Sequence, residues 1–201
     1  MRSIDFSLYA IIDTEICVGN PAHAAEKALG GGAGVLQFRC KRTDSESYMT
    51  ARKTGMLAKA KKAVFIINDR LDWAVALDAD GLHIGQSDIP LKICRKILGK
   101  EKLIGKSTHN LEQALIAQKE GADYIGIGPV SRTSTKKSEY PVVTSAELAE
   151  IARKVRIPVV AIGGITLSNA GELAGSGISG IAVISAICRA SDPKHAASRL
   201  K

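Results

Sequence analysis

The sequence predicts an α/β fold in which eight strand–helix pairs close into a (β/α)8 TIM barrel, on three observations. Short apolar runs without polar alternation, such as Ala63 to Ile67, are typical of strands buried on both faces. These runs alternate with segments of helical spacing through short connections, which requires a parallel sheet. Turns that contain glycine, at Gly34, Gly81, residues 121–123 and residues 177–180, come shortly before strands. Eight such pairs in 201 residues fit a closed barrel at the lower end of its usual size.

The predicted strands are short and rich in Val, Ile, Leu and aromatic residues, and turn or polar residues bound them. In chain order they are residues 6–13 (FSLYAIID), 34–40 (GVLQFRC), 63–67 (AVFII), 81–85 (GLHIG), 102–107 (KLIGKS), 123–130 (DYIGIGPV), 158–165 (PVVAIGGI) and 180–187 (GIAVISAI).

A predicted helix follows each strand, and several have clear end signals. Pro21 opens the first helix, residues 30–32 (GGG) end it, and Asp44 with Ser45 caps the second. The alternative architecture is an open doubly wound sheet, but no GxGxxG motif follows the first strand, which favours the barrel. In chain order the helices are residues 21–29, 45–61, 71–79, 90–98, 110–120, 145–155, 167–174 and 192–200.

Composition limits the classes of protein that this chain can represent. One compact domain over residues 1–201 is expected. No apolar run approaches the ~20 residues of a membrane span, and none resembles a signal peptide. We therefore expect a cytoplasmic protein without a membrane partner. The net charge of +8 suits polyanionic ligands, but aromatic residues are only 4% and are not interleaved with the cations, which argues against nucleic acid. Four scattered cysteines without a CxxC pair predict buried free thiols.

Two carboxylates follow neighbouring strands of the predicted barrel. Asp69 comes just after the third strand, and Asp88 comes just after the fourth. Because the carboxyl ends of parallel strands meet at one edge, both face the same pocket, where they repel each other unless a cation or a shared proton is present. We favour a divalent cation. The alternative, that each carboxylate caps the helix that follows it, stays open at this point.

Gln37, Arg39 and Lys41 share one face of the second strand because side chains alternate along a strand. A pair of cations on the inward face at the rim suits a phosphate or diphosphate. The alternative is that Arg39 and Lys41 form rim ion pairs with Asp13 or Asp44.

Two further segments point to a bound anion. Residues 131–140 (SRTSTKKSEY) are polar and basic and are suited to closing over an anion, although an ordinary loop is the alternative. Residues 163–164 (GG) and 184–185 (IS) follow the seventh and eighth strands, where many barrels bind phosphate through backbone N–H groups.

His83 and His109 are not expected to act as general bases, since no partner for either is identifiable. His83 alternates with glycines in its strand and is compatible with a core position, whereas His109 lies at a strand end where it can reach a ligand. Without an acid/base dyad, the chemistry expected is departure of a good leaving group assisted by a metal and cations.

Eight motifs, in order and at suitable spacing from the first strand to the eighth, together resemble the thiamine phosphate synthase family. They are QFRCK (37–41), FIINDR (65–70), DGLHIGQSD (80–88), IGKSTHN (104–110), GADYIGIGPV (121–130), TSTKK (133–137), VVAIGGIT (159–166) and GIAVISAI (180–187).

The resemblance implies a barrel transferase that joins 4-amino-5-hydroxymethyl-2-methylpyrimidine diphosphate to 4-methyl-5-(2-phosphoethyl)thiazole, or its carboxylate. The products are thiamine phosphate and pyrophosphate, formed through a pyrimidine carbocation. The resemblance further implies Mg²⁺ as the cofactor, held by Asp69 and Asp88. It implies that the pyrimidine diphosphate is held by Gln37, Arg39, Lys41, Asn68, Ser107 and Lys136, of which Arg39, Lys41, Ser107 and Lys136 are catalytic. It implies that the thiazole phosphate is held by Thr133, Ser134, Thr135, Gly164, Ile184 and Ser185.

Two departures from the family pattern are visible. Cys40 stands where the family usually has an acidic residue, and we expect it to point away from the site. The segment after Lys137 is short and lacks a glycine found in the family, which bears on closure of the loop over the thiazole half.

Two other functions compete with the synthase reading. A related branch of thiazole tautomerases keeps the phosphate site but does not need the metal carboxylates, and a precursor-binding regulator would have lost them. The intact Asp69 and Asp88 favour the synthase. The partners expected are small phosphorylated molecules, and the sequence is compatible with a homo-oligomer.

Overall fold

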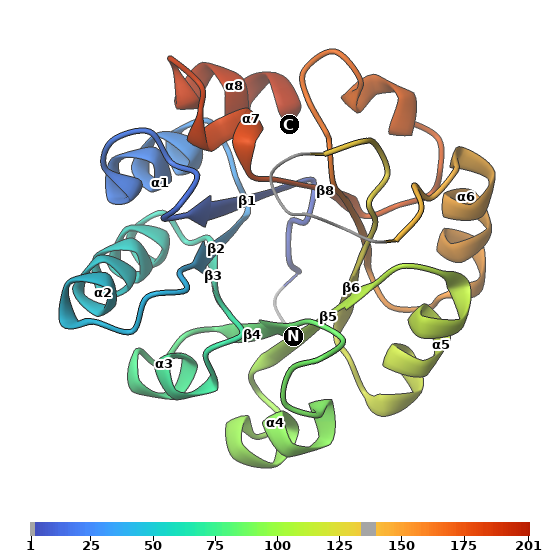
Figure 1. Cartoon of the computed structure of the whole chain (residues 1–201), viewed down its shortest axis with the longest axis horizontal. Coiled ribbons are helices and arrows are strands. Elements are labelled where there is room, and N and C mark those ends of the chain that lie inside the picture. The colour runs from blue at the N-terminus through green and yellow to red at the C-terminus, as the bar shows by residue number, and fades with distance from the viewer. Residues whose placement is uncertain (1–2, 134–139) are drawn as a thin grey trace.

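The computed structural model describes residues 3–133 and 140–201, and it confirms the predicted barrel. Eight parallel strands pair in sequence order, and β8 closes on β1. Helices surround the strands on the outside (Figure 1). The strands are β1 (Leu8–Asp13), β2 (Val35–Arg39), β3 (Val64–Asn68), β4 (Gly81–Ile84), β5 (Leu103–Thr108), β6 (Tyr124–Ile127), β7 (Val159–Ile162) and β8 (Gly180–Val183).

The helices agree with the prediction except near the C-terminus. They are α1 (Pro21–Gly30), α2 (Ser45–Ala60), α3 (Leu71–Ala76), α4 (Leu91–Leu98), α5 (Leu111–Glu120), α6 (Ser145–Lys154), the 3₁₀ helix η1 (Ala170–Leu173), α7 (Ser185–Cys188) and α8 (Pro193–Leu200).

The prediction of one strand over residues 180–187 is wrong in its second half. The strand ends at Val183, and α7 begins at Ser185. Residues 180–187 are one short apolar run, and periodicity alone cannot separate a buried strand from a buried helical turn. The break places the N-terminus of α7 at the rim of the barrel.

Alternation along the strands divides the apolar residues into two cores. On β2, Leu36 and Phe38 pack outward against the helices, whereas Val35 belongs to the core inside the barrel. Gln37 and Arg39 are two and four residues after Val35 on the same strand, so their side chains also point inward. The inner core consists of Phe6, Tyr9, Ile11, Val35, Ile66, Leu103, Tyr124, Val160 and Ala182.

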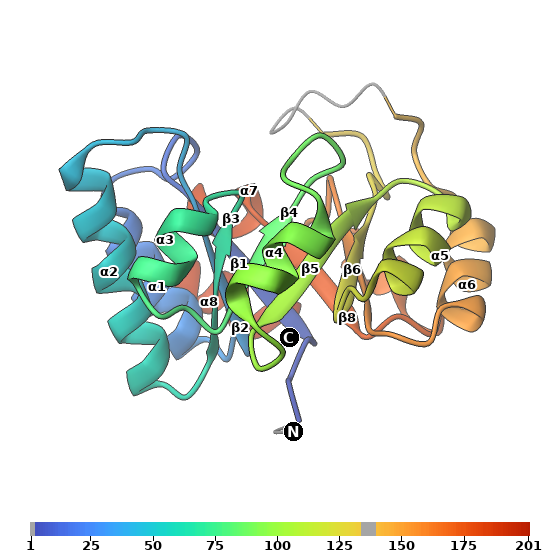
Figure 2. The same cartoon turned by 90° about the horizontal axis from the view of Figure 1, so that it is seen from below.

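Gly34, just before β2, and Gly180, the first residue of β8, are required by close packing against the N-terminal segment. A Cβ atom on Gly34 would overlap the carbonyl oxygen of Asp5, and one on Gly180 would overlap that of Phe6. The N-terminal segment therefore covers the end of the barrel opposite the loops that follow β3, β4 and β6 (Figure 2). Lys201 holds it there, because its Nζ donates to Asp5 and to the carbonyl of Gly32.

The expectation of four free thiols is wrong for one pair of cysteines. Cys17, in the loop after β1, and Cys188, at the end of α7, form a disulfide, whereas Cys40 and Cys94 are free and buried. The two bonded cysteines are 171 residues apart, and sequence spacing does not report that closure of the barrel brings them together. Among the described residues, no helix is long and apolar enough to cross a membrane.

Candidate active site

A cavity of roughly 70 Å³ opens inside the barrel near the carboxyl ends of the strands. Side chains from all around the barrel line it, including four residues that the sequence singled out for binding the pyrimidine diphosphate. Its walls are Tyr9, Ile11, Gln37, Arg39, Asn68, His83, Ser107, Tyr124, Gly126, Val160, Ile162, Ala182 and Ile184.

Arg39 lines this cavity and is held by a buried acidic partner. Its guanidinium forms an ion pair with Asp13, which is 1% exposed. The alternative in which Arg39 forms an ion pair with Asp13 is therefore correct as far as the pair itself is concerned. The pair does not remove Arg39 from the site, because a guanidinium has five donors and a single carboxylate leaves donors for a ligand.

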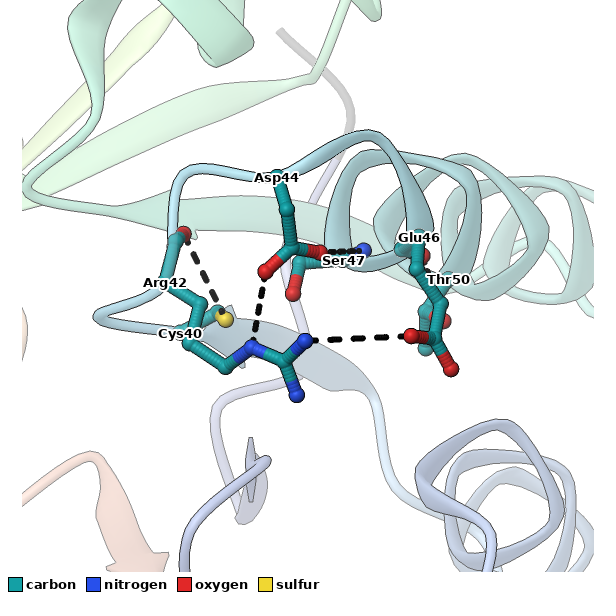
Figure 3. A network of polar contacts seen from close by, with 6 residues as sticks. All are labelled: Cys40, Arg42, Asp44, Glu46, Ser47 and Thr50. Atoms are coloured by element: carbon teal, nitrogen blue, oxygen red, sulfur yellow. Dashed lines mark hydrogen bonds and ion pairs between the residues drawn. The ribbon is translucent and has the colours of Figure 1, made fainter.

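Asp44 does not pair with Lys41, which is exposed. Asp44 accepts a hydrogen bond from the backbone N–H of Ser47 at the start of α2, and it also pairs with Arg42 (Figure 3). Backbone capping by Ser47, followed by the Arg42 side chain, lowers the pKa of Asp44 to about 2. The alternative in which Lys41 forms an ion pair with Asp44 is therefore wrong.

Cys40 points away from the cavity, as expected. Its sulfur lies 3.7 Å from the carbonyl oxygen of Arg42 (Figure 3), and it belongs to the outer core between strands and helices. The residue that departs from the family pattern is thus on the opposite face of the strand from Gln37 and Arg39.

Asp69 and Asp88 interact at the rim, as predicted from their strand ends. Burial, followed by the hydrogen bond and the charge of Asp88, raises the pKa of Asp69 to about 6, while Arg39 acts in the opposite direction. Asp69 nevertheless remains exposed to solvent. Its backbone has a φ of +57°, a left-handed conformation that Asp tolerates and that is often found at functional sites.

The helix-capping alternative for this pair is wrong. Neither α3 nor α4 has a side chain hydrogen-bonded at its N-cap. The Asp88 carboxylate instead accepts from the backbone N–H of Gly85 at 2.6 Å, within its own loop. Neither carboxylate therefore caps a helix, and the two interact with each other.

Two carboxylates fit a divalent cation that is shared with a phosphorylated ligand. Mg²⁺ is usually held by one or two carboxylates, with water and substrate phosphates completing its six ligands. Within residues 3–133 and 140–201, no cluster of three or more His, Cys, Asp or Glu side chains could hold a metal by itself. A repelling pair of rim carboxylates, one with a raised pKa, suits this shared form of binding.

The cavity floor carries a chain of polar side chains that the sequence reasoning missed. Tyr9 and Tyr124 share a hydrogen bond of 2.8 Å between their hydroxyls, and His83 bonds Tyr124 through Nδ1 and Ser107 through Nε2. His83 is thus a satisfied interior residue, as one reading of the sequence held. Inward alternation on β1 and β6 was the signal that could have placed both tyrosines there.

His109 lies on the other side of the rim, next to the loop that follows β6. Its Nδ1 is 2.5 Å from the carbonyl oxygen of Gly128, and its ring stacks on Tyr140 with centroids 3.5 Å apart. The expected contact of His109 with a ligand stays a prediction.

The described residues proposed for the thiazole phosphate follow β6, β7 and β8 along the chain: Thr133, Gly164, Ile184 and Ser185. Ser131 donates its backbone N–H to the carbonyl of Gly163, so the chain leading to Thr133 runs over the double glycine. Gly164 has a φ of +69°. Ile184 lines the cavity, and Ser185 begins α7 beside it. Ser134, Thr135 and Lys136, together with most of the predicted anion-closing loop, lie outside the described residues.

Comparison with known proteins identifies a family that matches this arrangement. Residues 8–187 match the family model described as thiamine monophosphate synthase. A thiamine-phosphate synthase of Laribacter hongkongensis is 43% identical over 195 residues, which cover 96% of this chain and 92% of that protein. One of Methanobrevibacter smithii is 43% identical over 201 residues, covering 100% of this chain and 96% of that protein.

A solved structure agrees with the sequence relatives. Thiamine phosphate pyrophosphorylase from Pyrococcus furiosus is 37% identical, with a TM-score of 0.89, and the match covers 98% of this chain and 94% of that one. These matches confirm the resemblance drawn from the eight motifs. The chain belongs to the thiamine monophosphate synthase family.

Proposed function

We propose that this protein is a thiamine phosphate synthase, a transferase that couples the pyrimidine diphosphate to the thiazole phosphate and releases pyrophosphate. The observation that carries the proposal is the position of the Asp69 and Asp88 pair beside a cavity lined by Gln37, Arg39 and Ser107. A mostly apolar cavity with a few polar side chains, and with cations and carboxylates near it, suits a substrate that has a small ring at one end and a diphosphate at the other. Family membership over nearly the whole chain supports the same reaction.

The residues divide the work between the two ends of the pyrimidine substrate. The ring would lie in the cavity against Gln37 and Ser107, and the diphosphate would lie at the rim near Arg39, Lys41, Asn68 and Lys136. Mg²⁺ held by Asp69 and Asp88 would supply charge neutralisation for the departing diphosphate. In this arrangement Arg39, kept in place by Asp13, faces the leaving group without having to reorganise.

The bond changes balance without a general acid or base. The C–O bond between the pyrimidine methylene and the diphosphate breaks, and its electron pair leaves with the diphosphate oxygen. The lone pair of the thiazole nitrogen then forms the new C–N bond to the methylene carbon. Because no proton has to move, the lack of an assigned acid/base dyad is compatible with the reaction.

Backbone groups are proposed to hold the thiazole phosphate. Gly164 and the N-terminus of α7 at Ser185 lie at the ends of β7 and β8, where backbone N–H groups are available to an anion. Thr133, Ser134, Thr135 and Ile184 would complete this half of the site. All substrates are then small soluble phosphate esters, which supports a cytoplasmic enzyme.

The test is pyrophosphate release from purified protein with both substrates and Mg²⁺, with a parallel reaction in EDTA. Release that depends on Mg²⁺ and matches thiamine phosphate formation mole for mole is the expected result. Folded protein that binds the thiazole phosphate but releases no pyrophosphate would contradict the proposal and would favour a tautomerase or a precursor-binding regulator.

A further inference from the structure

Five side chains from five strands form a continuous hydrogen-bonded chain across the cavity floor. Gln37 Nε2 is 2.6 Å from the Tyr9 hydroxyl, and the Tyr9 and Tyr124 hydroxyls are 2.8 Å apart. His83 lies 3.1 Å from Tyr124 through Nδ1 and 2.9 Å from Ser107 Oγ through Nε2. The proposed function uses only the two ends of this chain, Gln37 and Ser107.

The direction of each hydrogen bond follows from the Gln37 end. The Gln37 amide N–H donates to the Tyr9 oxygen, so the single Tyr9 proton must go to another acceptor. Within the described residues, that acceptor is the Tyr124 oxygen. Tyr124 then donates its own proton to His83 Nδ1.

Burial keeps both phenol protons in place. Tyr9 and Tyr124 are 2% and 1% exposed, and desolvation raises the pKa of each well above its ordinary value. Neither hydroxyl therefore ionises at neutral pH, and each can pass on only one hydrogen bond. The chain thus has one direction from Gln37 to His83.

That direction fixes what Ser107 presents to the cavity. Because His83 Nδ1 accepts, His83 carries its proton on Nε2 and donates it to Ser107 Oγ. The Ser107 proton is then free to donate to a ligand. At the other end, one of the two N–H groups of the Gln37 amide donates to Tyr9, and this bond orients the amide so that its carbonyl oxygen, on the other side of the group, is an acceptor.

We propose that Tyr124 and His83 are positioning residues that set these directions, so that the site presents an acceptor at Gln37 and a donor at Ser107. This pattern complements a ring that bears an amino group and an unprotonated ring nitrogen, and it opposes the 4-oxo analogue, which has the reverse pattern. The inference rests on the proposed pyrimidine site. Discrimination of this kind is strong because a mismatched ring leaves buried polar groups unpaired.

The matched variants are Tyr124→Phe and Tyr9→Phe, each of which removes one buried hydroxyl. In Tyr124→Phe, His83 Nδ1 loses its donor. In Tyr9→Phe, the Tyr124 hydroxyl loses its Tyr9 partner but still lies beside His83 Nδ1, and it still donates there because a phenol O–H is a stronger acid than a neutral imidazole N–H. The tautomer of His83 is read by long-range ¹H–¹⁵N NMR of the protein without substrate, which does not depend on catalysis and so separates this inference from the proposed function.

In wild type and Tyr9→Phe, we expect His83 to be protonated at Nε2 and not at Nδ1. In Tyr124→Phe, we expect protonation at Nδ1 to appear and kcat to fall about 10- to 100-fold, as for a misplaced catalytic group. The preference for binding the amino over the oxo pyrimidine should fall as well, while KM for the thiazole phosphate stays within about twofold.

Several outcomes would overturn the proposal. Wild-type His83 protonated at Nδ1 would reverse the chain and exclude the assigned direction. A Tyr124→Phe variant that keeps the wild-type tautomer, the wild-type kcat or the wild-type preference for the amino ring would show that the chain is structural only. Inactive wild type with the expected tautomer would contradict the proposed reaction but would leave the hydrogen-bond direction established.

Discussion

A Cβ atom on Gly164 would lie 2.5 Å from the carbonyl oxygen of Arg132 and 2.7 Å from that of Ser131. The loop after β6 therefore rests directly on the double glycine after β7. Contacts at this distance involve backbone atoms, which cannot move aside without moving the loop. The relation couples the two segments proposed to hold the thiazole phosphate.

Gly164→Ala is therefore expected to damage the thiazole half of the site selectively. The added methyl group and the φ of +69° both oppose the native backbone, so the loop must shift. We expect KM for the thiazole phosphate to rise about 10-fold or more, and binding of the pyrimidine diphosphate to change less than about twofold. Steady-state kinetics and calorimetry measure these two effects.

Gly171→Ala is the matched control, because no atom lies within 4 Å of a Cβ built at Gly171. It should leave both substrates unaffected. Equal losses for the two substrates in Gly164→Ala would exclude the assignment of this backbone to the thiazole phosphate.

Asp69→Ala is expected to remove the coupling reaction while the fold stays intact. Loss of one of the two proposed ligands would weaken the binding of Mg²⁺ where the charge of the diphosphate develops, so we expect turnover to fall at least about 100-fold. Asp78→Asn, which changes an exposed carboxylate paired with Lys102, is the control and should keep full activity. If Asp69→Ala kept wild-type turnover at limiting Mg²⁺, the metal assignment would be wrong.

Removing the negative charge of Asp69 should stabilise the metal-free protein. The pKa of Asp69 is raised from 3.8 to about 6, chiefly by burial and then by Asp88, so the folded state binds this proton more tightly than the unfolded state. Stability therefore falls as pH rises from about 4 to about 6, and the full penalty remains above that range. Asp69→Asn removes it at pH 7 and changes nothing at pH 3.

The magnitude is limited because Asp69 is exposed to solvent. We expect Asp69→Asn to raise the free energy of unfolding by no more than about 1 kcal/mol at pH 7 in EDTA. Denaturant titrations at several pH values measure this. A variant that is less stable than wild type at pH 7 in EDTA would show that the Asp69 charge is compensated in the folded state.

The strand ends made much of this site predictable from the sequence. Alternation placed Gln37 and Arg39 on one inward face, and the parallel order of strands placed Asp69 beside Asp88, because both rules depend only on local position. The hydrogen bond between Tyr9 and Tyr124 was not predictable in this way. It joins residues 115 positions apart, and an inward tyrosine in a strand pattern looks like any other core aromatic.

The same limit explains the errors near the C-terminus. The disulfide between Cys17 and Cys188 depends on the closure that brings β8 beside β1, which no local pattern records. β8 ends at Val183 because a helix begins at Ser185. A short apolar run such as residues 180–187 is compatible with either a strand or a helix, so the sequence pattern does not show where one ends and the other begins.

Lys106 is a buried cation that the structure connects to the proposed metal site. It is 8% exposed, and its Nζ donates to the carbonyl oxygen of Gly85 at 2.8 Å. The N–H of the same Gly85 donates to Asp88. Lys106 therefore holds the backbone that orients a proposed metal carboxylate.

Lys106→Met keeps the apolar stem of the side chain but loses this hydrogen bond. We expect the Mg²⁺ concentration for half-maximal activity to rise about 10-fold, as for loss of a group that orients a metal ligand, with kcat at saturating Mg²⁺ nearly unchanged. Lys96→Met, on the exposed face of α4, should leave the Mg²⁺ dependence as in wild type. Orientation of Asp88 can affect activity only through metal binding. If kcat at saturating Mg²⁺ fell while the half-maximal Mg²⁺ concentration stayed unchanged, Lys106 would instead stabilise the structure of the cavity.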